Sequence, residues 1–134
     1  MAQGSVCFID YVEKLHPVRK LLERVGYEVK VLEKSDSDNW MNPALNADAI
    51  IVYHTSLPPE SIAQLQKCKV IVCIGVTYED NIAIITAYKK GIAVSNIPPY
   101  TIINERRALL QTSMETLRGL SGMPLQNKYI ERGV

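Results

Sequence analysis

The turn that follows the apolar run Val70 to Ile74 has the residue types of an anion site. Gly75 permits a tight turn, because glycine lacks a Cβ atom. Backbone N–H groups that converge in front of a helix can then bind a negatively charged ligand. We predict a ligand-binding loop that consists of Gly75, Val76, Thr77, Tyr78 and Asn81.

Three side chains at the same predicted edge could transfer protons, namely His54, Tyr78 and Asp80. The imidazole of His54 follows a predicted strand and could also hydrogen-bond a ligand. No Ser, Cys or carboxylate partner for His54 is evident, which favours a structural histidine. Asp80 is better explained as the cap of the next helix. The three residues therefore remain catalytic candidates without an assigned role.

Tyrosines near the ends of predicted strands could line a pocket beside this loop. They are Tyr11, Tyr53, Tyr78 and Tyr100. Half-buried packing is an equally ordinary role for tyrosine at such positions. Tyr11 and His54 are kept among the predicted ligand-binding residues.

The sequence offers little for metal binding or thiol chemistry. His16 and His54 have no Cys or carboxylate at ligand spacing, so no metal site is predicted. The cysteines, Cys7, Cys68 and Cys73, are odd in number and suit a reducing cytosol better than a disulfide framework. No Lys, Arg or His adjoins Cys7 or Cys73 to lower its pKa, and we predict that both pack in the core.

Composition and charge exclude several classes of protein. The 134 residues are 47% hydrophobic, which suits one ordinary core. The 15 basic and 14 acidic residues nearly cancel, and no stretch gathers Lys or Arg, so nucleic-acid binding is not expected. The longest apolar stretch, Val70 to Val76, is too short to cross a bilayer, and no signal peptide is evident. We expect a soluble, cytoplasmic protein.

Short apolar strands alternate with amphipathic helical stretches along the chain. The strands are predicted at Ser5 to Asp10, Glu28 to Leu32, Ala49 to Thr55, Val70 to Ile74 and Ile92 to Val94. Helices are predicted from Pro17 to Gly26, from Pro58 through Cys68, from Asn81 to Lys90 and from Thr101 through Leu117. Residues 33–46 are predicted as a loop with at most one helical turn.

This alternation predicts a doubly wound, flavodoxin-like α/β fold. The parallel five-stranded sheet has the expected order 2-1-3-4-5, with helices on both faces and a long C-terminal helix plus arm. The fourth strand is apolar enough to lie at the centre. No G-x-G-x-x-G occurs, and Gly119-Leu-Ser-Gly122 follows a helix instead of a strand, so no dinucleotide cofactor is predicted.

Several motifs together resemble the D-isomer-specific 2-hydroxyacid dehydrogenases, closest to their C-terminal-binding-protein branch. They are Ala49-Ile-Ile-Val-Tyr-His-Thr55, Ile71-Val-Cys-Ile-Gly75, Asp80-Asn81-Ile82 and Gly91-Ile-Ala-Val-Ser-Asn-Ile-Pro98. The resemblance implies that the amides of Val76, Thr77 and Tyr78 face a substrate carboxylate. This chain departs from the family there, because Val-Thr-Tyr-Glu, with one extra residue, replaces the small-glycine pattern and Ala83 replaces an acidic residue.

The resemblance also divides the chain into two parts. Residues 1–100 correspond to a flavodoxin-like substrate-type domain, and residues 101–134 to a C-terminal helix and arm that could serve association. Glu105 occupies the place of a recurrent family glutamate, and Gln126 to Gly133 resembles an arm that packs between subunits. The family's NAD-binding domain and its catalytic Arg, Glu and His have no counterpart, so the chain is expected not to be a self-sufficient dehydrogenase.

Three functions fit these expectations. The first is a binding or interaction module for a small carboxylate or a protein partner, which associates as a homodimer or hetero-complex through the arm and Leu109, Leu110, Met114 and Leu117. The second is a cofactor-independent enzyme for a small acid or carbonyl compound. The third is a dehydrogenase half that a nucleotide-binding subunit completes in trans.

Overall fold

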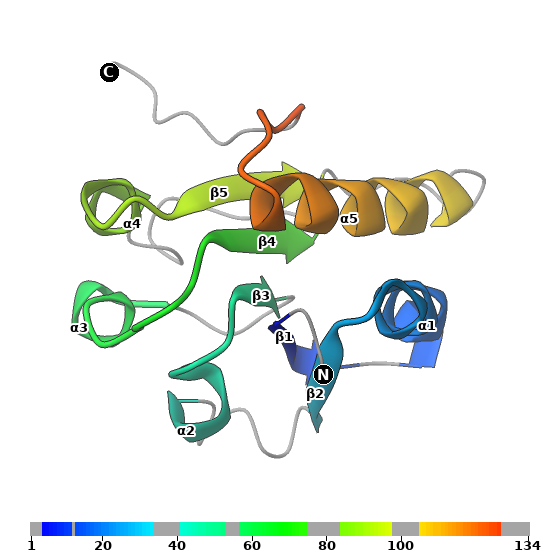
Figure 1. Cartoon of the computed structure of the whole chain (residues 1–134), viewed down its shortest axis with the longest axis horizontal. Coiled ribbons are helices and arrows are strands. Elements are labelled where there is room, and N and C mark those ends of the chain that lie inside the picture. Colours follow the sequence, from blue (N-terminus) through cyan, green and yellow to red (C-terminus); the bar gives the residue numbers. More distant parts are fainter. Residues whose placement is uncertain are drawn as a thin grey trace.

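The computed structural model describes residues 4–11, 13–33, 41–52, 57–74, 84–97 and 105–126. Five parallel strands form one sheet in the order β2-β1-β3-β4-β5 (Figure 1), which confirms the predicted fold class. The strands are β1 (Ser5–Tyr11), β2 (Glu28–Glu33), β3 (Ala49–Val52), β4 (Val70–Ile74) and β5 (Ala93–Ile97). The helices are the 3-10 turn η1 (Glu13–Leu15), α1 (His16–Val25), α2 (Met41–Ala44), α3 (Pro59–Ile62), α4 (Ile84–Lys89) and α5 (Glu105–Leu120).

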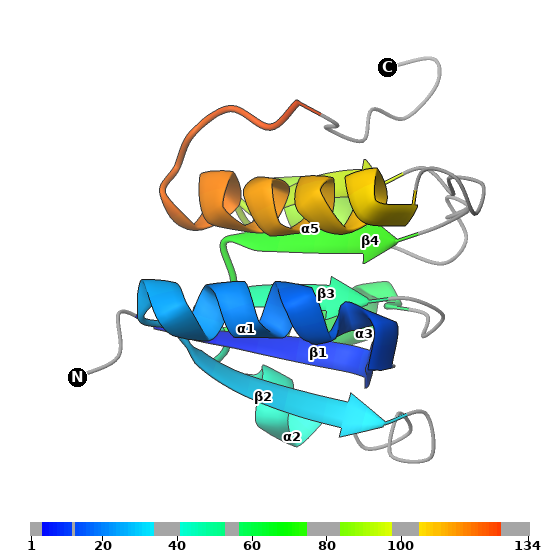
Figure 2. The ribbon, with the colours of Figure 1, turned by 90° about the vertical axis from the view of Figure 1, so that its right-hand side faces the viewer.

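Helices cover both faces of the sheet. The helices α1 and α5 lie side by side on one face, and α2, α3 and α4 lie on the other (Figures 1 and 2). Each face has its own apolar cluster, because successive strand residues point to opposite sides. The strands β3 and β4 are buried on both faces throughout, as parallel strands between helix layers must be. No helix in the described ranges is long and apolar enough to span a membrane.

Most predicted elements are found, with shifted boundaries. Gly26 ends α1 with φ 116°, a left-handed conformation that favours glycine. The strand β5 continues past the predicted Val94 to Ile97. The strand β4 is interior, but β3 is the central strand of the sheet. The predicted third strand is described only to Val52, since residues 53–56 lie outside the described ranges.

The helix predicted from Pro58 through Cys68 is wrong in length, since α3 ends at Ile62. The backbone N–H of Gln66 donates to the carbonyl of Leu45, and that of Lys69 donates to the carbonyl of Asp48. These bonds to a distant segment replace the hydrogen bonds that would continue the helix. The predicted apolar residue Leu65 still packs in the core, but it does so from a turn.

The helix α5 lies close to the sheet because small residues form much of its buried face. Thr112, Ser113 and Thr116 are each at most 3% exposed. Their hydroxyls donate to the carbonyls four residues earlier, so no hydroxyl proton is left buried without an acceptor. Gly119 completes this face against Val70 of β4.

The apolar residues predicted for association on α5 divide into two pairs. Leu109 and Leu117 are partly buried and pack against the cluster between α5 and the sheet. Leu110 and Met114 are 57% and 41% exposed, one helical turn apart. The exposed apolar face of α5 is therefore narrower than the sequence predicted, because two of its four residues pack against the core.

Replacing Gly119 by alanine should destabilise the protein. In an exposed helix this change stabilises by about 1 kcal/mol, because alanine is the better helix former. Here the new Cβ atom would overlap the Val70 side chain, with Cγ1 at 2.7 Å, and would push α5 away from β4. We expect Gly119→Ala to lower the free energy of unfolding by about 1–3 kcal/mol in urea denaturation.

Ser121→Ala is the control, since Ser121 is exposed just beyond the same helix. It should change the free energy of unfolding by less than about 0.5 kcal/mol. An unchanged or increased stability of Gly119→Ala would contradict the close packing of α5 on β4.

Candidate functional site at the carboxyl edge of the sheet

The carboxyl ends of the strands meet at one edge of the molecule. Parallel pairing aligns Ile9 with Val52, Val52 with Cys73, and Cys73 with Asn96. All five arrowheads point toward this edge in Figure 2. In an open parallel sheet, ligands bind beyond these ends, where the strand order reverses. In the order β2-β1-β3-β4-β5 that point lies between β1 and β3.

The predicted ligand-binding loop leaves the sheet at this edge. Its residues follow Ile74, the last residue of β4, and His54 belongs to the segment that follows Val52 of β3. The predicted site residues His54, Gly75, Val76, Thr77, Tyr78, Asp80 and Asn81 lie outside the described residues. The edge from which both segments start is thus defined, while the roles of these side chains remain predictions. Of the predicted ligand-binding residues, Tyr11 is described.

Asp10 changes the direction of β1 just before its end. It is 2% exposed and has φ 68°, a left-handed conformation that costs most residues energy but that Asp tolerates better than most. The three steps from Phe8 to Tyr11 lie opposite the two steps from Val31 to Glu33 of β2, so β1 carries a bulge. Regular alternation would place Phe8 and Tyr11 on opposite faces. The bulge at Asp10 places both on the face that α1 covers.

Tyr11 is held on that face by contacts with its neighbours. Its ring meets Phe8 edge-to-face with centroids 5.6 Å apart, and the guanidinium carbon of Arg19 lies 5.8 Å from the ring centroid. The hydroxyl of Tyr11 forms a hydrogen bond of 3.3 Å with Nδ1 of His16. His16 is exposed, and the sequence did not indicate its bond to Tyr11. Tyr11 therefore projects toward the start of α1.

Asn96, near the end of β5, carries an unsatisfied acceptor. Its Oδ1 atom is buried and has no hydrogen-bond partner among the residues that the structure describes. A buried acceptor without a donor costs about 1–3 kcal/mol, so such groups are rare in folded proteins. The sequence placed Asn96 at the edge but could not indicate that its carbonyl oxygen lacks a donor.

The cysteines pack in the core, as predicted for Cys7 and Cys73, which are 0% and 1% exposed. Burial raises the pKa of Cys7 to about 11, although the nearby Lys30 opposes this shift. Burial likewise raises the pKa of Cys68 to about 12, against a hydrogen bond with the carbonyl of Val70. Because a thiol reacts as its thiolate, these groups are poor nucleophiles at neutral pH.

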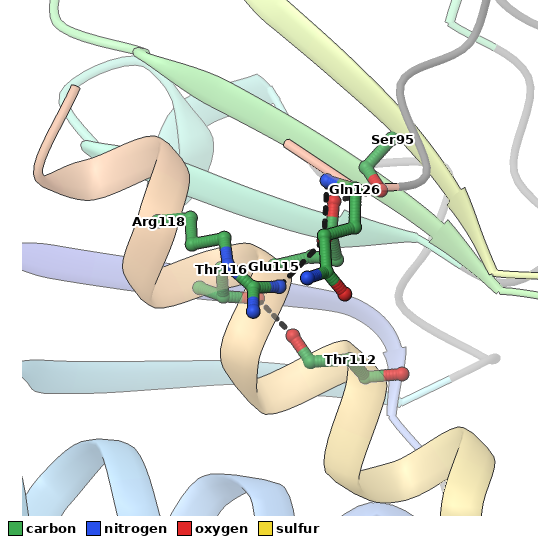
Figure 3. Close-up of polar contacts among 6 residues, drawn as sticks. All are labelled: Ser95, Thr112, Glu115, Thr116, Arg118 and Gln126. Carbon is green, nitrogen blue, oxygen red and sulfur yellow. Dashed lines mark hydrogen bonds and ion pairs between the residues drawn. The ribbon is translucent and has the colours of Figure 1, made fainter. Parts of the chain in front are cut away.

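A buried carboxylate ties three segments together behind this edge (Figure 3). Glu115 of α5 is 1% exposed. Its Oε2 accepts a hydrogen bond of 2.8 Å from the hydroxyl of Ser95 in β5. Its Oε1 accepts bonds of 2.9 Å from Nη1 of Arg118 and from the backbone N–H of Gln126. The side chain of Glu115 thereby fixes α5 to the sheet and the following segment to α5.

Sequence reasoning did not identify Glu115 or Ser95. A signal was present, because Glu115 lies seven residues after Ala108 and one before Thr116, on the small-residue face of the predicted helix. An acidic residue on a face that must be buried indicates a partner elsewhere in the fold. The partner, Ser95, could not be found from spacing, since it lies on a different strand.

Replacing Glu115 by glutamine should cost more than removing an exposed ion pair. Glutamine has the same shape, but it lacks the negative charge and presents N–H donors where Glu115 accepts. We expect Glu115→Gln to lower the free energy of unfolding by about 2–3 kcal/mol, and Ser95→Ala by about 1 kcal/mol, in urea denaturation.

The matched control is Glu23→Gln on α1, where the carboxylate lies 3.6 Å from Arg19 and its side chain is 44% exposed. This exposed pair should contribute less than about 1 kcal/mol. Equal losses for Glu115→Gln and Glu23→Gln would contradict the role given to the buried carboxylate.

Comparisons with known proteins match this chain to one family. A family model described as the catalytic domain of D-isomer specific 2-hydroxyacid dehydrogenase matches residues 8–104. The NAD+-bound 3-phosphoglycerate dehydrogenase of Entamoeba histolytica has 30% identity, covers 72% of this chain and superposes with a TM-score of 0.64. The D-lactate dehydrogenase of Escherichia coli has 14% identity over 72% of this chain, with a TM-score of 0.60, and so shares the fold.

An acyclic imino acid reductase, solved with NADPH and D-Arg, has 23% identity over 87% of this chain, with a TM-score of 0.60. A search of curated proteins gives no match. The chain spans about a third of the length of the first two solved structures, 33% and 32%, and 42% of the reductase. By its family match and its sheet order, the chain belongs to the D-isomer specific 2-hydroxyacid dehydrogenase family and corresponds to its catalytic-type domain.

Proposed function

We propose that this chain is a substrate-binding-type domain that holds a small carboxylate ligand at the carboxyl edge of its sheet and performs no hydride transfer alone. The observation that carries this proposal is the parallel pairing of β3 and β4. Because of it, the segments after Val52 and Ile74 both begin at the carboxyl edge of the sheet. In the family that the sequence resembles, the second of these segments presents backbone amides to a substrate carboxylate. The same role is proposed for Val76, Thr77 and Tyr78.

The unsatisfied acceptor at this edge supports the proposal. Asn96 is aligned with Cys73, next to the last residue of β4. Its buried Oδ1 accepts no hydrogen bond from the described part of the chain, and a hydroxyl group of a 2-hydroxy acid could donate one. A ligand that carries both a carboxylate and a neighbouring hydroxyl would thus match the amides of the loop and the oxygen of Asn96.

A dehydrogenase completed in trans is the second candidate. Similar solved structures favour this candidate, since one of them is a 3-phosphoglycerate dehydrogenase with bound NAD+. The 134 residues contain no G-x-G-x-x-G motif, so under this proposal a separate subunit would bind the nucleotide. The ligand at the carboxyl edge would then be the substrate.

Titration with D-lactate and NADH tests the binding function. We expect D-lactate to cause saturable amide shifts at Ile74 and Asn96 in ¹⁵N NMR spectra, while NADH causes none with the isolated chain. Asn96→Ala should weaken D-lactate binding by about tenfold, because it removes the acceptor for the hydroxyl.

Asn46→Ala is the control, since Asn46 is exposed and lies before β3, at the opposite edge of the sheet. NADH binding to the chain alone would contradict the proposal that it lacks a nucleotide site. Absence of saturable shifts with D-lactate would contradict a carboxylate site at this edge.

We also propose that α5 mediates association with a second copy or a partner protein. Leu110 and Met114 expose 57% and 41% of their surface on the solvent side of α5.

Light scattering at micromolar concentration should detect a dimer, and Leu110→Glu with Met114→Glu should convert it to a monomer. Ile85→Glu on α4, also 50% exposed but on the other face, should leave the dimer intact. A monomeric wild-type protein would contradict self-association.

A further inference from the structure

An open surface cavity that the proposed function does not use lies between the start of α1 and α5, next to the carboxyl end of β1. Its volume is about 520 Å3, and the described residues that line it are Glu13, Lys14, His16, Pro17 and Leu109. Sites for small molecules commonly have volumes of about 300–1,000 Å3. This cavity lies on the face that α1 and α5 cover. Asn96 points to the other face, because its neighbour Ser95 bonds to Glu115 of α5 and successive strand residues alternate.

The lining combines opposite charges with an apolar wall. Glu13 supplies a carboxylate, and the next residue, Lys14, supplies an ammonium group. His16 adds an imidazole, and Pro17 and the half-buried Leu109 are apolar. A simple anion would meet repulsion from Glu13, and a simple amine would meet repulsion from Lys14. A zwitterion with an aliphatic group is complementary to this lining, because it carries both charges and an apolar part.

The hydrogen bond from Tyr11 orients the imidazole of His16. When the Tyr11 hydroxyl donates to Nδ1, at 3.3 Å, the ring proton lies on Nε2, which can donate to a carboxylate. The bulge at Asp10 and the contacts with Phe8 and Arg19 hold Tyr11 in this position. The donor at His16 is therefore oriented from the end of β1, although His16 itself is exposed.

We propose that this cavity binds an α-amino acid with an aliphatic side chain. The carboxylate of the ligand lies at His16 and Lys14, its ammonium group at Glu13, and its side chain on Pro17 and Leu109. The charged groups of the lining are exposed, so water and salt screen them. Binding is therefore millimolar and weakens as ionic strength rises.

Three probes of matched shape test the proposal: L-leucine, 4-methylpentanoate, which lacks the ammonium group, and 3-methylbutylamine, which lacks the carboxylate. In ¹⁵N NMR titrations L-leucine should give saturable amide shifts at residues 13–16, 18 and 109. The other two probes should bind more weakly by about tenfold, since each loses one charge-assisted contact.

Two variants separate the contacts. Glu13→Gln should weaken L-leucine by about fivefold to tenfold and leave 4-methylpentanoate unchanged or tighter, because only the amino acid carries an ammonium group. Glu60→Gln, an exposed change on α3 at the other face, should affect neither probe. Asn96→Ala should leave L-leucine binding unchanged, which separates this site from the one proposed at Asn96.

Several results would overturn the proposal. Equal affinities for the three probes would mean that only apolar contact is made. Shifts centred on Ile74 and Asn96 would place the amino acid at the ends of β4 and β5 instead. The absence of saturation by L-leucine would leave the cavity without this ligand, whether or not D-lactate binds at the edge.

Discussion

The carboxylate of Glu115 is the interaction on which the arrangement of the C-terminal third depends. A carboxylate withdrawn from water is tolerated only where donors replace its hydration. Here the donors come from β5 through Ser95, from α5 itself through Arg118, and from the segment after α5 through Gln126. A displacement of α5 would strip a buried charge of these donors. The charge therefore selects one position of the helix among those that apolar packing alone would allow.

Close packing of α5 follows from the same requirement. The distance between Ser95 and Glu115 is bridged only if α5 lies near the sheet, and Gly119 allows this because any side chain there would collide with Val70. Thr112 and Thr116 fill the remaining space and satisfy their hydroxyls within the helix. The position of α5 in turn brings Leu109 to the cavity at the start of α1, which Pro17 also lines.

Two residues at the carboxyl edge have a conformation or an environment that costs free energy. Asp10 adopts a left-handed backbone, and Asn96 buries an acceptor to which no described residue donates. Such costs persist in a structure where the surrounding packing is strong, and they concentrate where ligands bind. The family match covers residues 8–104 and so includes both positions. The segment predicted to bind the ligand, which includes Val76 to Glu79, follows β4 at the same edge.

The sequence by itself determined the fold class, the family and most of the strands. Runs such as Val70 to Ile74 are apolar enough to be buried on both faces, and Pro17 and Gly26 delimit α1 through local backbone preferences. The branch within the family stays a prediction, because the family match does not distinguish branches. The roles of His54 and the residues from Gly75 to Asn81 stay predictions, because these residues lie outside the described ranges.

Only the tertiary structure decided which side chains meet. Spacing predicted that Tyr11 follows β1, but the bulge at Asp10 turned it toward His16, since one extra residue reverses the alternation of a strand. Spacing likewise gave α5 an apolar stripe, whereas its buried face is built largely from Thr112, Ser113, Glu115 and Thr116. The periodicity of a sequence depends only on the hydrophobicity of one segment, so it predicts which apolar residues share a face. The burial of a charge or a hydroxyl depends on partners that other segments bring to it.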